Sequence, residues 1–339
     1  MKYLAIFILT LATSIYAQVD PTSTESVQTI KTDKIDFTFT PAAFYLFGKT
    51  EYDFHLTQLV ADTSGALVDF TVRSFLEFPL DVFVAGASIG IGSPEDADKS
   101  WSAEVGMFTN VSDPGKSMKD SDWYTLENNF AETMVSYTES DAKMDMLLVN
   151  AEVTKELFNV GNADIAILAG FRYQKIEQNI IGYDGWQLDT NFVQQPVSGT
   201  GPALDYMVTY KGPQFGALTR IDFSSSVQIN IKTAVSLTWV KDKDDHLLRK
   251  FHTLADGQGI GFISQIGARW FTGSRLMGHN SYVDFVGSYD YYKADISSTR
   301  VQYGDGGPSE PPVGYTVGGL PHDIKSQQFK LGLRFGLIF

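Results

Sequence analysis

Apolar and polar residues alternate with a period of two along much of the chain, which is the pattern of β-strands whose two faces meet different surroundings. The last eleven residues, FKLGLRFGLIF, carry aromatic or aliphatic residues at every odd position, whereas Lys330 and Arg334 stand at even positions. Residues 164–174 and 282–291 repeat the pattern, with charged residues opposite the apolar face. A terminal strand with a wholly apolar face and a final Phe is typical of outer-membrane barrels, in which apolar residues face lipid.

Ten such segments can be counted, and an even number of antiparallel strands closes an up-and-down barrel without a free edge. We therefore predict an all-β fold, a ten-stranded antiparallel transmembrane β-barrel. Pro79 lies inside the second segment and predicts a bulge or a shorter strand there, because proline cannot donate to the ladder. The segments lie near residues 34–48, 66–91, 101–111, 140–157, 163–178, 203–223, 227–241, 259–271, 281–296 and 325–339.

The connections between these segments alternate in length. Residues 158–162 and 224–226 are short links, whereas the polar stretches 179–202 and 297–324 are interpreted as long loops. In outer-membrane barrels the short turns lie on the periplasmic side and the long loops outside.

The leader sequence, the cysteine content and the net charge limit which cellular compartment and which classes of partner are expected. Residues 1–17 place one lysine before a short apolar stretch that ends in small residues, which predicts a secretory signal peptide and a mature barrel over 18–339. The absence of cysteine excludes a disulfide framework and a cysteine nucleophile. A formal net charge of −14 disfavours nucleic acid and favours cationic partners.

An acidic cluster follows the segment 227–241, in the stretch WVKDKDDHLLRK. If the strand continues past the bilayer edge, Asp242, Asp244 and His246 share its inward face. An aspartate two residues before a histidine can orient the imidazole as a general base. The alternative is a pair of solvated loop residues.

A second cluster, SMKDSDWY, follows the third segment and contains Asp120 and Asp122. Odd-numbered strands of an up-and-down barrel end at the same rim, so the two clusters can face each other across one cleft. The alternative is a hydrated acidic loop or a calcium site. We expect no other metal, because no zinc-type spacing occurs. The remaining histidines, interpreted as loop or rim residues, are His55, His252, His279 and His322.

Five motifs, taken in their order along the chain, resemble those of the omptins, the ten-stranded outer-membrane protease family. They are GKT at 48–50, MKDSDW at 118–123, AGFRYQ at 169–174, WVKDKDDH at 239–246 and the closing aromatic strand.

The resemblance implies a catalytic set and a reaction. Asp120 and Asp122 match the aspartate pair of the family, and Asp244 and His246 match its Asp-His dyad. The implied function is a monomeric outer-membrane endopeptidase that faces the cell exterior, uses activated water without a covalent intermediate or cofactor, and cleaves cationic polypeptides. The alternative from another class is a catalytically silent barrel that serves as an adhesin or narrow pore.

The resemblance also suggests substrate residues, although the match is incomplete. Family members that cut between basic residues use a glutamate just after GKT and an aspartate two before the catalytic aspartate. Asp242 fills the second position, but the first holds Tyr52, with Glu51 one place early. Glu132 is expected to supply acidity on the far side of the scissile bond.

A lipid site on the outer wall is the last implication of the resemblance. Omptins need lipopolysaccharide as an activator, and the wall here offers Phe171, Tyr173 and Lys175. Lys175 stands where the family pattern has arginine. The alternative is that Lys175 extends to water from the bilayer edge without a specific ligand.

Overall fold

The structure, a computed structural model, describes residues 35–61, 65–93, 100–126, 132–276, 278–307 and 310–339. The predicted signal peptide, residues 1–17, lies outside the described residues. Within them the chain is built of strands, and no helix is long and apolar enough to cross a membrane.

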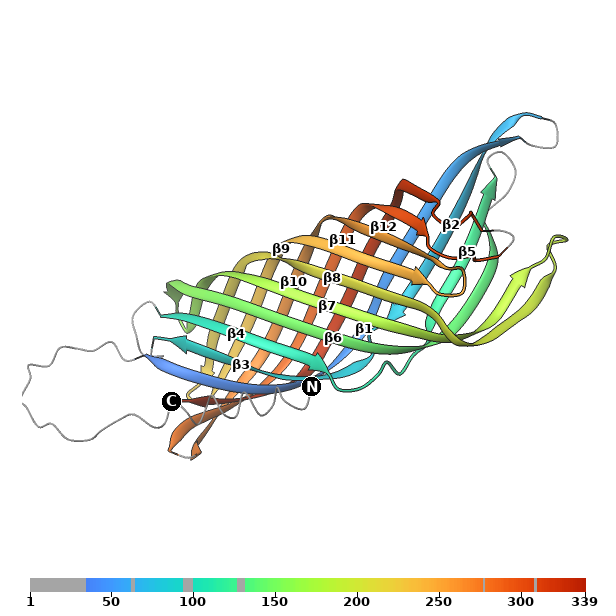
Figure 1. Cartoon of the computed structure of the whole chain (residues 1–339). Helices are drawn as coiled ribbons and strands as arrows, with labels where there is room; N and C mark the ends of the chain where they lie inside the picture. The colour runs from blue at the N-terminus through green and yellow to red at the C-terminus, as the bar shows by residue number, and fades with distance from the viewer. Residues whose placement is uncertain (1–34, 62–64, 94–99, 127–131, 277, 308–309) are drawn as a thin grey trace, which may run out of the picture. The chain divides into compact units, whose positions relative to one another are not determined.

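Twelve strand segments pair antiparallel, and the last pairs with the first, so that the sheet closes on itself (Figure 1). They are β1 (Asp36–Ala61), β2 (Leu67–Pro79), β3 (Val82–Gly92), β4 (Trp101–Asn110), β5 (Met118–Leu126), β6 (Thr133–Val160), β7 (Ala163–Leu188), β8 (Gln194–Ser224), β9 (Val227–His246), β10 (Phe251–Leu276), β11 (His279–Gln302) and β12 (Thr316–Ile338).

Two strands of the wall are interrupted. The long strand β1 pairs with β3 along its first half and with β2 along its second, and β6 pairs with β4 and β5 in the same way. The pairs β2/β3 and β4/β5 are therefore each one wall strand in two pieces, which confirms the predicted ring of ten. The first interruption follows Pro79, as the sequence predicts, and Leu80 N there donates to Gly48 O at 3.1 Å.

Gly48, the first residue of the GKT motif, occupies a position that only glycine tolerates. Its φ of +136° is unfavourable for a residue with a side chain. A Cβ at this position would lie 2.0 Å from the carbonyl oxygen of Gln327 in β12. The glycine of the motif is therefore needed for the structure, because it lets the backbones of β1 and β12 approach closely enough to pair and close the ring.

The two stretches interpreted as long loops, 179–202 and 297–324, are mostly strand, so that prediction was wrong. β7 continues to Leu188 and β8 resumes at Gln194, and only residues 189–193 connect them. Likewise, β11 continues to Gln302 and β12 resumes at Thr316. The short links 158–162 and 224–226 are confirmed as tight connections.

The outer wall carries an apolar belt bounded by charges, as expected of a strand barrel that crosses a membrane. The belt ends toward β5 at outward-facing lysines, among them Lys49, Lys175, Lys241, Lys293 and Lys325. Exposed members of the belt include Phe83, Ile89, Val105, Ile167, Phe171, Phe215, Val235, Leu237, Ile260, Phe285, Leu331 and Leu333.

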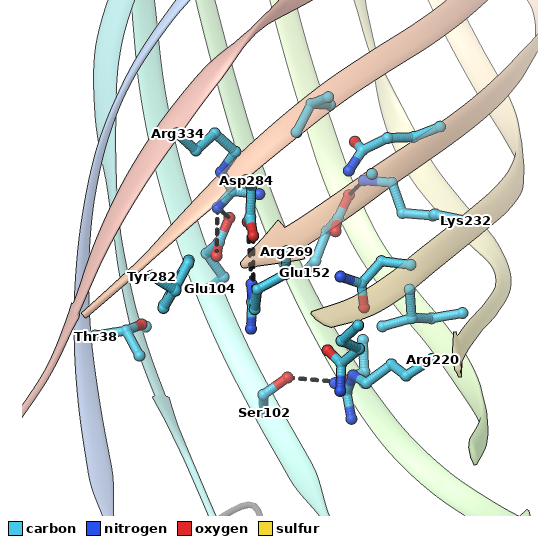
Figure 2. A pocket seen from close by; sticks show the side chains of 18 of the residues that line it. Thr38, Ser102, Glu104, Glu152, Arg220, Lys232, Arg269, Tyr282, Asp284 and Arg334 are labelled. Atoms are coloured by element: carbon cyan, nitrogen blue, oxygen red, sulfur yellow. Dashed lines mark hydrogen bonds and ion pairs between the residues drawn. The ribbon is translucent and has the colours of Figure 1, made fainter. Parts of the chain in front are cut away.

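The interior contains a polar chamber at the end with the short turns. This cavity of about 980 Å³ is lined by ion pairs, some between adjacent strands and some across the lumen (Figure 2). Arg334 Nη2 lies 2.9 Å from Glu104, Arg269 Nε lies 2.8 Å from Asp284, and Lys232 Nζ lies 2.8 Å from Glu152. Paired and hydrated charges are tolerated on an inward face but not on a lipid-facing one.

A packed layer closes the lumen above the chamber. Phe78 from β2 and Tyr206 from β8 stack across the lumen with centroids 3.9 Å apart. Gln174 and Gln328 exchange two hydrogen bonds of 3.0 and 3.1 Å in the same interior. Fully buried side chains of this interior include Leu46, Leu76, Phe78, Leu80, Ile176, Ile180, Tyr206 and Ile324. The layer separates the chamber from the end that carries β5.

Candidate active site

The predicted Asp-His pair lies on the inward face of β9, which extends to His246 as expected. Asp244 Oδ2 lies 2.9 Å from Nε2 of His246, and the aspartate side chain is 3% exposed. When the carboxylate accepts from Nε2–H, the lone pair of the imidazole remains on Nδ1.

The repulsion within the cluster is limited because its members face different ways. Asp245 points outward, where its carboxylate accepts from Lys243 Nζ at 2.7 Å and from the Tyr303 hydroxyl at 2.9 Å. The lower part of β9 has β-branched residues and alternating polarity, which favour a strand. Beyond the outward-facing lysines, the outward ion pair and hydrogen bond of Asp245 stabilise its extension.

Asp120 and Asp122 lie on β5, an extended strand, and so not in the acidic loop named as the alternative. Asp122 Oδ2 accepts from the Ser136 hydroxyl of β6 at 2.8 Å. Asp120 Oδ1 is buried without a hydrogen-bond partner. Asp120 pairs in register with Leu76 of β2, and Leu76 pairs with Tyr52 of β1. Asp120 and Asp122 therefore lie just beyond the outward-facing lysines that end the apolar belt.

The two pairs approach the lumen from opposite parts of the ring and interact electrostatically. Burial, followed by the charge of Asp122, raises the pKa of Asp120 to about 7, and the charges of His246 and Asp244 act on it too. The carboxyl group of Asp120 therefore keeps its proton to a higher pH than a free aspartate does. A protonated carboxyl group opposite an oriented imidazole provides both a donor and a base.

Aromatic and cationic residues support His246, and the sequence analysis missed them. The imidazole stacks on Phe251 with ring centroids 4.3 Å apart, and Arg300 lies 3.5 Å from the centroid of the same ring. Glu310 binds both Arg300 and Arg249. Arg300 lies on the same face of β11 as residues 296, 298 and 302. The sequence analysis ended this strand at residue 296 and therefore could not include Arg300.

Asp242 and Tyr52 also face the lumen, beneath the dyad. Both are buried, with exposed fractions of 0% and 4%. His322 of β12 joins them: its Nε2 lies 3.4 Å from Asp242 Oδ2, and its ring stacks on Tyr52 at 4.7 Å. The interpretation of His322 as a loop or rim residue was wrong, because β12 begins earlier than the apolar alternation and His322 is 1% exposed.

The structure does not bring the other two predicted substrate residues to this site. Glu51 has the outward parity of β1 and lies 2.7 Å from Lys49 Nζ. Glu132 lies 3.3 Å from Arg73 NH1, and that guanidinium also binds Asp53 at 2.8 Å. Both carboxylates therefore already have cationic partners away from the dyad.

The predicted lipid residues lie on the outer wall of β7. Phe171 is 47% exposed, and Tyr173 and Lys175 share its parity. Lys175 Nζ lies 2.7 Å from Glu177, so an anionic lipid group would compete with that carboxylate.

Comparison with known proteins places the chain by its fold. No protein-family model matches the sequence, and no curated protein matches it. The crystal structure of the outer membrane protease OmpT from Escherichia coli superposes with a TM-score of 0.69 at 14% identity, over 94% of this chain and 100% of that one. The outer membrane protein OprG from Pseudomonas aeruginosa gives a TM-score of 0.31 at 10% identity, over 90% and 95%.

The chain has the fold of OmpT. This agrees with the omptin resemblance of the motifs, because the same whole-length barrel is reached from the sequence and from the structure. At this level of identity the comparison describes the fold, and the chemistry has to be argued from the side chains.

Proposed function

We propose that the protein is an outer-membrane endopeptidase that hydrolyses peptide bonds with an activated water molecule. The observation that carries the proposal is the 2.9 Å Asp244–His246 pair on the inward face of β9, together with the electrostatic coupling of this pair to Asp120 on the opposite wall. The likeness to a protease fold supports it.

The proposed reaction uses each group according to its surroundings. Nδ1 of His246 removes a proton from the water as its oxygen attacks the carbonyl carbon, and Asp244 stabilises the imidazolium. Asp120 and Asp122 hold the water, with Asp120 in its protonated form. When the C–N bond breaks, the imidazolium returns its proton to the leaving nitrogen, which leaves a free carboxyl group and a free amine.

The packed interior favours this function over the alternative of a narrow pore. A pore needs a continuous hydrated path, but the Phe78–Tyr206 stack and the residues around it fill the lumen between the two polar ends. An active site above a closed floor needs no such path. An adhesin role has no comparable support among the described residues.

Location and partners complete the proposal. Outer-membrane proteins have this fold, and the short turns at the chamber end suit the periplasmic side, which directs the candidate site to the cell exterior. The formal net charge of −14 attracts cationic polypeptides over long distances. We expect a monomer that uses no cofactor, with lipopolysaccharide as an activator at the outer wall near Lys175.

The test is cleavage of peptides by the purified barrel, with the products identified by mass spectrometry. Internal cleavage that persists in the presence of serine-directed acylating reagents and chelators is expected, because the nucleophile is water. Inactivation by a serine-directed reagent would overturn the proposed chemistry.

A further inference from the structure

The floor beneath the candidate dyad is a cluster of three side chains from three strands. Asp242 precedes Asp244 by two residues on the inward face of β9, so it lies directly below the dyad. His322 of β12 approaches it to 3.4 Å, and Tyr52 of β1 stacks on His322. All three are at most 4% exposed, and the Asp242 carboxylate is closed off from solvent beside the stacked rings of His322 and Tyr52.

This floor offers little to a cationic side chain. A lysine or arginine that enters the lumen from the scissile bond meets aromatic rings before it reaches Asp242. Burial raises the pKa of Asp242, which disfavours its charged form, and His322 Nε2 stands 3.4 Å from the carboxylate without forming a hydrogen bond to it. A cation would therefore lose its water without gaining an exposed counter-charge.

The walls around the floor have the same character. Phe54 of β1 packs against the interior, and the neighbouring strands add buried aliphatic and uncharged polar side chains, the latter including Thr253 and Ser298. Arg249 and Arg300 add positive charge beside His246, although Glu310 binds both. Buried aliphatic residues on these inward faces are Ile180, Leu204, Ile296 and Leu320.

We propose that the endopeptidase selects an uncharged side chain at the substrate position that enters the lumen beside Tyr52, and that it rejects lysine and arginine there. This rests on the proposed function and makes its substrate class specific. It is compatible with cationic polypeptides as substrates. The negative net charge of the barrel attracts the whole polypeptide, whereas the floor contacts only one substrate side chain. It departs from the cleavage between basic residues of the resembled family, at the position where Tyr52 stands in place of the family's glutamate.

The experiment is a cleavage profile on a peptide library in which every residue type is equally represented. Wild-type protein is expected to cut with uncharged residues at one position flanking the bond and with lysine and arginine depleted there. Tyr52→Ala removes the covering ring and should raise cleavage at lysine or arginine in that position at least tenfold. Tyr52→Ala combined with Asp242→Asn should lose this gain. Glu51→Gln, on the outer face, is the matched control and should leave the profile unchanged.

The outcomes separate this inference from the proposed function. Wild-type cleavage predominantly at lysine or arginine overturns the inference and leaves the endopeptidase standing. An unaltered profile for folded Tyr52→Ala also overturns it. If Tyr52→Ala does not fold, the wild-type profile decides. A wild-type protein that cuts no peptide in the library, while intact and folded, overturns the proposed function and the inference with it.

Discussion

Asp120→Asn is expected to stabilise the barrel while it removes activity. A carboxyl group whose pKa is higher in the folded than in the unfolded protein binds its proton more tightly when folded, so its ionisation disfavours the folded state. For Asp120 the pKa rises from 3.8 to about 7. The resulting cost is fully present above about pH 7 and disappears as the pH falls below about 4.

The magnitude follows from this difference. One pKa unit corresponds to ~1.36 kcal/mol, so the ionised carboxylate costs at most ~4 kcal/mol at high pH. Asp120 Oδ1 is buried without a hydrogen-bond partner, but the residue as a whole is only half-buried. Solvent screening lowers the expectation for Asp120→Asn to a gain of about 2–4 kcal/mol at pH 9, with little gain at pH 4.

Urea unfolding in detergent micelles, followed by tryptophan fluorescence at pH 4, 7 and 9, measures this gain. Asp256→Asn is the matched control, because Asp256 is an exposed residue on the outer face of β10. Peptide cleavage by the same preparations should fall about a hundredfold for Asp120→Asn alone. An equal stability of wild type and Asp120→Asn at pH 9, or a gain that does not change with pH, would refute the reasoning.

Three further expectations concern the dyad, the topology and the lipid. Replacing His246 or Asp244 with alanine should lower peptide hydrolysis about a hundredfold or more without loss of the folded barrel, as judged by its heat-modifiable migration in gels. Because the chain has no cysteine, single cysteines can map its orientation: Leu248→Cys should react with an impermeant thiol reagent on intact cells, whereas Ser225→Cys should not, and the reverse pattern would invert the topology. Lys175→Ala should shift activation by lipopolysaccharide to about fivefold higher lipid concentration, as the loss of one partly exposed ion contact worth ~1 kcal/mol implies; an unchanged activation curve removes the lipid site.

The membrane-crossing part of the fold could be predicted because lipid imposes a strict alternation. Each outward residue there must be apolar, so the period of two is visible in the sequence, and it fixed the inward parity of Asp244 and His246. Beyond the outward-facing lysines that end the apolar belt, both faces of each strand contact water or polar groups. The extensions of β7 and β8 are held by backbone hydrogen bonds, which leave no pattern of hydrophobicity, and they were therefore mistaken for loops.

The floor of the site could not be predicted for a different reason. Parity alone would have placed His322 inward once β12 was extended, but its contact with Asp242 joins residues from β9 and β12 across the lumen. Such a contact depends on strand tilt and on the register of every pair between them, which a single sequence does not specify. The outward position of Glu51 followed from the same registers.

The measurement that tests the central claim most directly is peptide hydrolysis by four proteins purified and refolded in parallel: wild type, His246→Ala, Asp122→Asn and His55→Ala. His55 is an exposed histidine of β1, so it controls for the loss of an imidazole as such. Internal cleavage by wild type and His55→Ala at similar rates is expected, with a loss of about a hundredfold or more in the other two. Cleavage by His246→Ala at the wild-type rate would contradict this expectation.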